Sequence, residues 1–278
     1  MGDVSWQGTT PDPSVGSNWS SGSVPTNGDR VFLQHQFNNP MSGDAVTFSA
    51  KAFSSWNVDD LFTAAVGGSG APVVFSADTI RHAGEGDFYW RNGTHASSSD
   101  LVIVASRGGN IQLGAGSSNA VGRVILEKGN IDFEGSGTAA FTVVEITPRD
   151  VIQSLLDVTF TAGMATTPDV YVNGGKVTVN DDITNMHVAN TAEVRYSAGS
   201  LASLFQSGGM FYYDTSATLT LAAIMGGLFD ASQDARAKTI ITLKVLNQAR
   251  ANLDNGANSI TVTNPQYAPG AMVIRPTT

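Results

Sequence analysis

The chain has 278 residues, enough for one long domain or two, and its 24 acidic and 15 basic residues give a formal net charge of −9 at pH 7. This acidic balance argues against a sequence-independent grip on nucleic acid, and the absence of cysteine excludes disulfides, thiolate metal sites and cysteine catalysis. Charged residues make up only 14% of the chain, which is typical of short strands and turns rather than long surface helices.

The first residues show no targeting signal. The segment from Met1 to Trp6 lacks the basic and apolar regions of a secretory signal. The chain also lacks a run of about 18 apolar residues that would span a membrane. We therefore expect synthesis in a cytoplasm and no membrane partner.

The N-terminal third differs in composition from the rest. All four tryptophans, Trp6, Trp19, Trp56 and Trp90, lie before residue 95, among Pro, Gly, Ser and Asn. We interpret residues 1–95 as a cap or docking module that precedes the main domain of residues 96–278. The tryptophans either cover the first exposed strands or anchor a partner, since Trp is enriched among interface hot spots.

Strand-like segments begin near Leu101 and continue to the end of the chain. The early ones include Leu101–Val104, Gly109–Leu113 and Gly129–Phe133, and the two that open with Gly-Asn-Ile lie 20 residues apart. One segment breaks this pattern, because Thr147–Leu156 combines an N-cap threonine, a proline at the first helical position and an apolar stripe. We predict a helix of two turns there.

The later chain repeats a short pattern of small turn residues followed by an alternating strand. Aligning the strands gives steps of 17, 17 and 18 residues. At about 3.3 Å per extended residue, one step is about 56 Å of chain, enough for three short strands and three corners. The residues at the repeated positions are Gly174, Gly175, Val177, Val194, Gly208, Gly209, Phe211, Gly226, Gly227 and Phe229.

This repeat predicts an all-β fold, a parallel β-helix or β-solenoid with about 17–20 residues per coil and a right-handed coil by default. A single coil cannot bury its own apolar face, but stacked coils can. Gly174 and Gly208 are expected at corners with positive φ, where glycine is favoured. The alternative is a β-sandwich in which the spacing is coincidental.

Candidate catalytic groups are few. Polysaccharide lyases and hydrolases built on this architecture need carboxylates or basic residues gathered on one surface. The candidates are Asp59-Asp60, which lies outside the repeats, and Asp181-Asp182, which follows the Val177–Val179 strand where a solvated turn is expected. His35, His82, His95 and His187 lack metal-ligand spacing, and no nucleotide-binding or calcium-repeat motif occurs. We predict no catalytic site, cofactor or metal.

Aromatic residues gather near the repeats. They are Tyr171, Tyr196, Phe211, Tyr212 and Tyr213. Aromatics in register on neighbouring coils stack for stability, whereas an exposed row could receive a sugar ring or a neighbouring subunit. Both interpretations fit the sequence.

The order of these signals resembles β-helical structural proteins of tailed bacteriophages, and more narrowly their capsid decoration or cement proteins. The resemblance covers most of the chain, but it rests on where Gly and Trp residues occur between the strand segments and not on a catalytic motif. The segments that carry it are Trp6, Trp19 and Gly28-Asp29, then Val66–Pro72, Gly84–Tyr89, Gly227–Asp230 and Lys238–Ile240.

The resemblance implies a protein on the outer capsid surface that links neighbouring major capsid subunits, as a homodimer or homotrimer. It would be made in the host cytoplasm and end in the virion, with residues 1–95 as the capsid-docking module. An alternative is a tail-associated protein, like a tailspike or fibre, that binds carbohydrate. Proteins of that kind share the solenoid but usually have a longer chain and an acidic or aromatic groove for carbohydrate.

Overall fold

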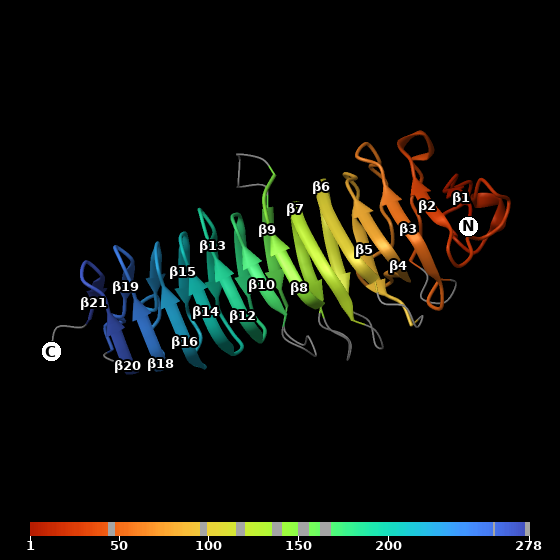
Figure 1. The fold of residues 1–278 in the computed structure, drawn as a ribbon. Helices are drawn as coiled ribbons and strands as arrows, with labels where there is room; N and C mark the ends of the chain where they lie inside the picture. Colours follow the sequence, from red (N-terminus) through yellow and green to blue (C-terminus); the bar gives the residue numbers. More distant parts are fainter. Residues whose placement is uncertain are drawn as a thin grey trace. The chain divides into compact units, whose positions relative to one another are not determined.

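The computed structural model describes residues 1–43, 48–94, 99–114, 120–134, 141–149, 156–161, 168–257 and 259–275. In this part of the chain, nearly all regular structure is parallel β, and the stacked coils form a β-solenoid of about ten turns (Figure 1). The predicted parallel β-solenoid is confirmed, and the β-sandwich is excluded because sandwiches pair their strands antiparallel.

The chain divides into two compact units, the first formed mainly by Met1–Val143. The elements of the first unit are β1 (Asp3–Ser5), η1 (Gly16–Asn18), β2 (Arg30–Leu33), η2 (His35–Phe37), β3 (Ala52–Val58), β4 (Val73–His82), β5 (Phe88–Asn92), β6 (Ser99–Gly114) and β7 (Val121–Glu134), where η1 and η2 are 3₁₀ turns. Strands β8 (Phe141–Ile146) and β9 (Leu156–Phe160) each divide between the two units.

The second unit continues with twelve further strands in its described residues. They are β10 (Asp169–Val172), β11 (Lys176–Val179), β12 (Ile183–Val188), β13 (Glu193–Tyr196), β14 (Leu201–Gln206), β15 (Met210–Tyr213), β16 (Thr218–Ile224), β17 (Leu228–Asp230), β18 (Lys238–Val245), β19 (Arg250–Asn252), β20 (Ile260–Tyr267) and β21 (Met272–Ile274).

Strands of the second unit form two parallel stacks, one of even-numbered and one of odd-numbered strands. In the odd-numbered stack, Val177 pairs with Val194, Val194 with Phe211, and Phe211 with Phe229. These are the positions that the 17-residue repeat aligned, so the repeat gives the register directly. The ladder continues from Phe229 to Ala251 and Val273, at longer steps.

Each coil of the second unit has two strands rather than the three expected, because one of them bends. In β12 the buried residues are Ile183, Met186 and Val188, so the alternation shifts by one residue after Ile183. The same shift occurs in β14 and β18. A strand that changes its buried face turns a corner, so one bent strand supplies two sides of the coil and the odd-numbered strand supplies the third.

Inward side chains of successive coils pack on each other and form the core. Phe211 and Phe229 stack with ring centroids 6.0 Å apart and an angle of 7° between their planes. Burying one such side chain contributes about 1.5–3 kcal/mol relative to exposure. Since every coil adds the same inward positions, stability accumulates coil by coil through contacts between neighbours.

The parallel ladder starts well before residue 95. Strand β1 pairs with β2, β2 with β3, β3 with β4, and β4 with β6. The expected change of architecture near residue 95 is therefore not seen in the flanking described residues, and the compact units divide near Val143 instead. Residues 95–98, and residues 150–155 of the predicted helix, lie outside the described part of the chain.

The glycine pairs work differently from the sequence-based expectation. Positive φ occurs at the second glycine of each pair, with 79° at Gly175, 68° at Gly209 and 78° at Gly227. Neither Gly174 nor Gly208 has positive φ, so the corner was placed one residue too early. Gly208 is required for a different reason, because a Cβ there would lie 2.8 Å from the backbone N of Asn190.

We predict that Gly209→Ala destabilises the protein by about 2–3 kcal/mol, since it combines positive φ with a Cβ placed 2.4 Å from the carbonyl oxygen of Ala192. Gly68→Ala is the matched control, because Gly68 lacks positive φ and a Cβ there meets no atom within 4 Å. Urea denaturation of both variants checks this. Equal midpoints for Gly209→Ala and the parent would contradict the assigned corner.

His82 is a polar residue in an apolar core. It pairs in register with Val58 and Val104, is 1% exposed, and stacks on Phe88 with centroids 4.7 Å apart. Neither ring nitrogen has a hydrogen-bond partner among the described residues. Burial lowers the pKa of His82 from 6.5 to about 3, so the folded protein holds the neutral ring.

This burial predicts a loss of stability in acid. The unfolded chain binds a proton at His82 below about pH 6.5, and the folded chain does so only near pH 3. Stability is therefore fully present above pH 6.5 and falls as pH drops toward 3, by up to about 1.4 kcal/mol per pH unit from this group.

The variant His82→Leu should flatten this part of the stability profile, measured by urea denaturation from pH 7 to pH 4. His187→Gln serves as the control, because His187 lies on the outward side of β12 and is only partly buried. The control should keep the slope of the parent. The same slope in His82→Leu and the parent would contradict the role of His82.

Candidate functional site

The four tryptophans lie inside the first unit rather than on its surface. Their exposures are 0–1%. Trp6 packs edge-on against Trp19, and Trp56 stacks on Phe75 with centroids 4.2 Å apart. The expectation that Trp6, Trp19, Trp56 and Trp90 bind a partner is therefore corrected, because side chains buried to this degree offer a partner no surface.

Backbone carbonyls satisfy most of these indoles. Three tryptophans each donate a hydrogen bond from the Nε1–H group to a carbonyl oxygen. Trp6 donates to Asn39 (3.0 Å), Trp19 to Pro13 (2.9 Å) and Trp90 to Phe75 (3.1 Å). Trp56 Nε1 has no partner among the described residues. The tryptophans thus fill the N-terminal end of the core and tie its loops to it.

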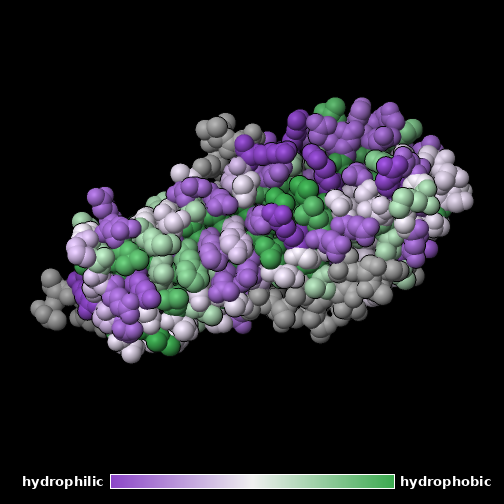
Figure 2. Space-filling view, viewed as in Figure 1, coloured by the Kyte–Doolittle hydropathy of each residue, from purple (hydrophilic) through white to green (hydrophobic). Residues whose placement is uncertain are grey.

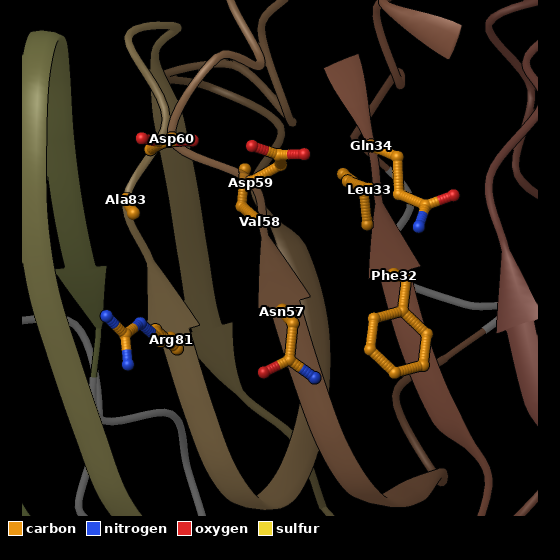
Figure 3. Close-up of a pocket in the computed structure, with 9 residues that line it drawn as sticks. All are labelled: Phe32, Leu33, Gln34, Asn57, Val58, Asp59, Asp60, Arg81 and Ala83. Carbon is orange, nitrogen blue, oxygen red and sulfur yellow. The ribbon is translucent and has the colours of Figure 1, made fainter. Parts of the chain in front are cut away.

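A hollow of about 370 Å³ lies on the outer side of β2, β3 and β4 (Figure 3). Phe32, Asn57 and Arg81 occupy neighbouring register positions on these three strands and form one row along it. Asp59 and Asp60 follow β3 and lie alongside this row, beyond the C-terminal ends of the strands. The structure therefore brings one of the two predicted carboxylate pairs to a surface hollow.

Asp59 is held as a carboxylate by its neighbours. Its Oδ2 lies 2.8 Å from His35 Nδ1, and its Oδ1 accepts the backbone N–H of Leu61 at 3.2 Å. Burial opposes ionisation, but the hydrogen bonds from His35 and Leu61 outweigh it and lower the pKa of Asp59 to about 2. Asp60 forms an ion pair with Arg107 at 3.4 Å.

These contacts keep Asp59 ionised at neutral pH. General acid–base catalysis needs a group whose pKa lies near the working pH, which the low pKa of Asp59 does not provide. Three other lining groups can contact a polar ligand. The Asn57 amide and the Arg81 guanidinium can donate hydrogen bonds to it, and the Phe32 ring can stack on it. His35 does not line the hollow, but folding brings it to Asp59 although 24 residues separate the two in the sequence.

The second carboxylate pair stabilises a corner. Asp182 Oδ1 accepts hydrogen bonds from the backbone N–H of Ser200 at 2.6 Å and from its hydroxyl at 2.8 Å. The Asp181 carbonyl accepts the hydroxyl of buried Tyr196 at 2.8 Å. Both aspartates thus connect one coil to the next at a turn, although Asp181 is buried rather than solvated as expected.

The predicted aromatic group separates into three places. Tyr196, Phe211 and Tyr213 are buried in the core. Tyr212 lies on the outward side of β15, under the guanidinium of Arg195 at 5.0 Å. Tyr171 lies on the outward side of the even-numbered stack and is 37% exposed.

Tyr171 begins a surface row that we call the outer aromatic row, formed by Tyr171, His187 and Phe205. These residues are register partners on β10, β12 and β14. Tyr171 and His187 stack with centroids 4.5 Å apart, and His187 and Phe205 with centroids 5.0 Å apart. Sequence reasoning missed the last two, although their steps of 16 and 18 residues follow the coil period and could have revealed them.

The column beside the outer aromatic row carries little charge. This outward column lies two residues earlier on each strand. Its first residue is an aspartate, and the others carry amide or hydroxyl groups, apart from one leucine. It consists of Asp169, Asn185, Ser203, Leu221, Thr242 and Asn264. Figure 2 shows apolar and polar residues interspersed on the visible face of the second unit.

A group of ion pairs stabilises the corner that precedes β18. Lys238 Nζ is fully buried and donates to Asp234 Oδ1 at 2.5 Å and to the Asp234 carbonyl at 3.1 Å. Nearby, Arg195 pairs with Asp214 at 2.6 Å. Burial raises the pKa of Asp214 despite this arginine, whereas hydrogen bonds from Lys238 and Arg236 outweigh burial and lower the pKa of Asp234.

Within the described ranges, no three or more His, Asp or Glu side chains gather as they would around a metal ion. The histidines lie apart, with His35 beside Asp59, His82 in the core and His187 in the outer aromatic row, and His95 is outside the described residues. No described helix is long and apolar enough to cross a membrane. No protein-family model, curated protein or solved structure matches the chain.

We predict that Lys238→Met lowers the free energy of unfolding by about 1–3 kcal/mol, because it removes the buried donor to the Asp234 and Arg236 carbonyls, while Asp234 keeps its ion pair with Arg236. Lys244→Met on the same strand is the control, since Lys244 points outward and should change stability by less than about 0.5 kcal/mol. Thermal and urea unfolding of both variants measure the difference. Equal effects would contradict a structural role for the buried pair.

Proposed function

We propose that this chain is a non-enzymatic structural protein that decorates the capsid of a tailed bacteriophage and links neighbouring major capsid subunits. Support comes from the resemblance in Gly and Trp punctuation and from the solenoid itself. A scaffold whose strands pair throughout along its backbone loses little conformational entropy when it binds, so its contact area is used efficiently. Self-association into dimers or trimers would increase the number of capsid contacts per particle.

The observation that carries the proposal is the outward side of the even-numbered stack in the second unit. It combines the outer aromatic row with the weakly charged column beside it, and both run in register from coil to coil. Cores of protein interfaces are depleted in charge and enriched in aromatic residues. The residues 1–95 are no longer the preferred docking module, because their tryptophans are buried.

The hollow on β2–β4 favours a second candidate function, carbohydrate binding by a tail-associated protein. Its lining places one ring, one amide and one guanidinium in a row, with two carboxylates alongside it. Polar groups of this kind, converging around an aromatic ring, are typical of small-molecule sites. This candidate differs from the first in its location as well as in its ligand.

Co-sedimentation tests the capsid proposal. The purified chain is mixed at physiological salt with expanded capsids, prepared without it, from the phage that encodes it. We expect saturable co-sedimentation at a constant ratio to capsid subunits. No co-sedimentation, together with binding of an oligosaccharide that Arg81→Ala abolishes, would favour the second candidate.

A pair of variants locates the contact. Tyr171→Lys introduces a charge into the outer aromatic row at a residue that is 37% exposed, and we expect it to weaken capsid binding at least tenfold. Leu61→Lys is the control, because Leu61 is 50% exposed and lies in the first unit. Equal binding by the two variants would move the contact away from this row.

A further inference from the structure

The outer aromatic row ends abruptly. The next register partner of Phe205 is Ala223, and the partner of Ala223 is Lys244. Three coils in succession thus present a ring at this position, the fourth presents a methyl group and the fifth an ammonium group. The fourth coil lacks the ring that would continue the stack.

The ring geometry shows which way the open face of Phe205 points. Successive planes in the row differ by only 9° and 15°, and the centroid spacings of 4.5 and 5.0 Å match the distance between neighbouring strands. The rings therefore stack along the direction in which coils succeed each other. Since His187 covers one face of Phe205, the other face is directed toward the coil of Ala223, and no described ring contacts it.

Lys244 lies on the other side of Ala223 from Phe205. Two coil steps separate it from Phe205, or about 9.6 Å between backbones. A ring placed over Ala223 would lie about 4.8 Å from each neighbour, within the roughly 6 Å at which a cation attracts an aromatic face. Lys244 forms no ion pair with any residue that the structure describes.

Neighbouring outward residues complete the surroundings. Leu221 lies two positions before Ala223 on the same strand and supplies apolar surface. Its register partners on the flanking coils, Ser203 and Thr242, supply hydroxyl groups that can bond a phenol or an indole N–H. The place thus offers a ring face, a cation and polar groups at the edge.

We propose that Phe205, Ala223 and Lys244 form a receptor for one aromatic side chain of a protein partner, a tyrosine or tryptophan that stacks on Phe205 above the methyl group of Ala223. The cation selects an electron-rich ring, since it interacts with the face quadrupole that an alkyl chain or a sugar lacks. The identity of the partner as a capsid subunit rests on the proposed function. The receptor itself rests only on these three residues.

Methyl NMR tests the receptor on the isolated protein. The chain is labelled with ¹³C at its alanine methyl groups and titrated with N-acetyl-tyrosine amide. We expect a saturable downfield shift of the Ala223 methyl proton, because the bound ring lies parallel to Phe205 and its edge faces the methyl, where the ring current deshields. N-acetyl-cyclohexylalanine amide and a methyl glucuronoside serve as alkyl and acidic-sugar probes, and neither should produce this shift.

Three variants sharpen the test. Phe205→Leu and Lys244→Met each remove one wall, and each should weaken probe binding about two- to tenfold. Ala223→Phe places a ring of the chain itself in the receptor and should abolish binding. Ala202→Phe is its matched control, since Ala202 is exposed on β14 outside the row, and it should bind the probe as the parent does.

Two results would overturn the receptor: an unmoved Ala223 methyl at saturating probe, or an equal response to the alkyl or sugar probe. Capsid co-sedimentation separates this inference from the proposed function. Capsid binding that Ala223→Phe leaves unchanged would overturn the receptor and retain the capsid partner. A ring-current shift at Ala223 in a chain that does not bind capsids would retain the receptor and remove that partner.

Discussion

Parallel pairing of backbone strands between successive coils is the constraint on which the rest of the structure depends. It places each residue beside a partner one coil away, as Val177, Val194, Phe211 and Phe229 show. Every side chain is therefore part of a column, and its neighbours along the column decide whether it packs, stacks or repels. The register therefore determines the core, the corners and the surface together. Inward columns are apolar, corner columns are hydrogen-bonded and outward columns contact solvent.

The sequence predicted the coil period and the inward columns because both leave a local signal, a 17-residue step and an alternating strand. It placed the positive-φ corner one residue early, since a glycine pair does not reveal which member takes positive φ and which one faces a close backbone. It also misjudged the tryptophans. Large rings among turn residues fit either a surface anchor or a filled core end, and only the packing of Trp6 against Trp19 decides between them.

The candidate sites were harder to predict, because they depend on residues that only folding brings together. His35 and Asp59 come from different coils, and their contact stabilises a carboxylate that the sequence presented as a catalytic candidate. His82 carries no signal that separates it from a surface histidine, although it lies in an apolar core. The outer aromatic row is an intermediate case, since its spacing follows the coil period but its members are three different residue types.

The break in the outer aromatic row is itself informative. Cross-strand aromatic pairs each add roughly 0.2–1 kcal/mol relative to alanine pairs, so stability alone would favour a ring at residue 223 as well. The chain instead places Ala223 between Phe205 and Lys244, where its own stacking energy is lost. A surface that leaves one ring face and one cation unsatisfied is stabilised when a partner supplies the missing ring. Pairing between coils thus determines both what the chain buries and what it leaves for a partner to complete.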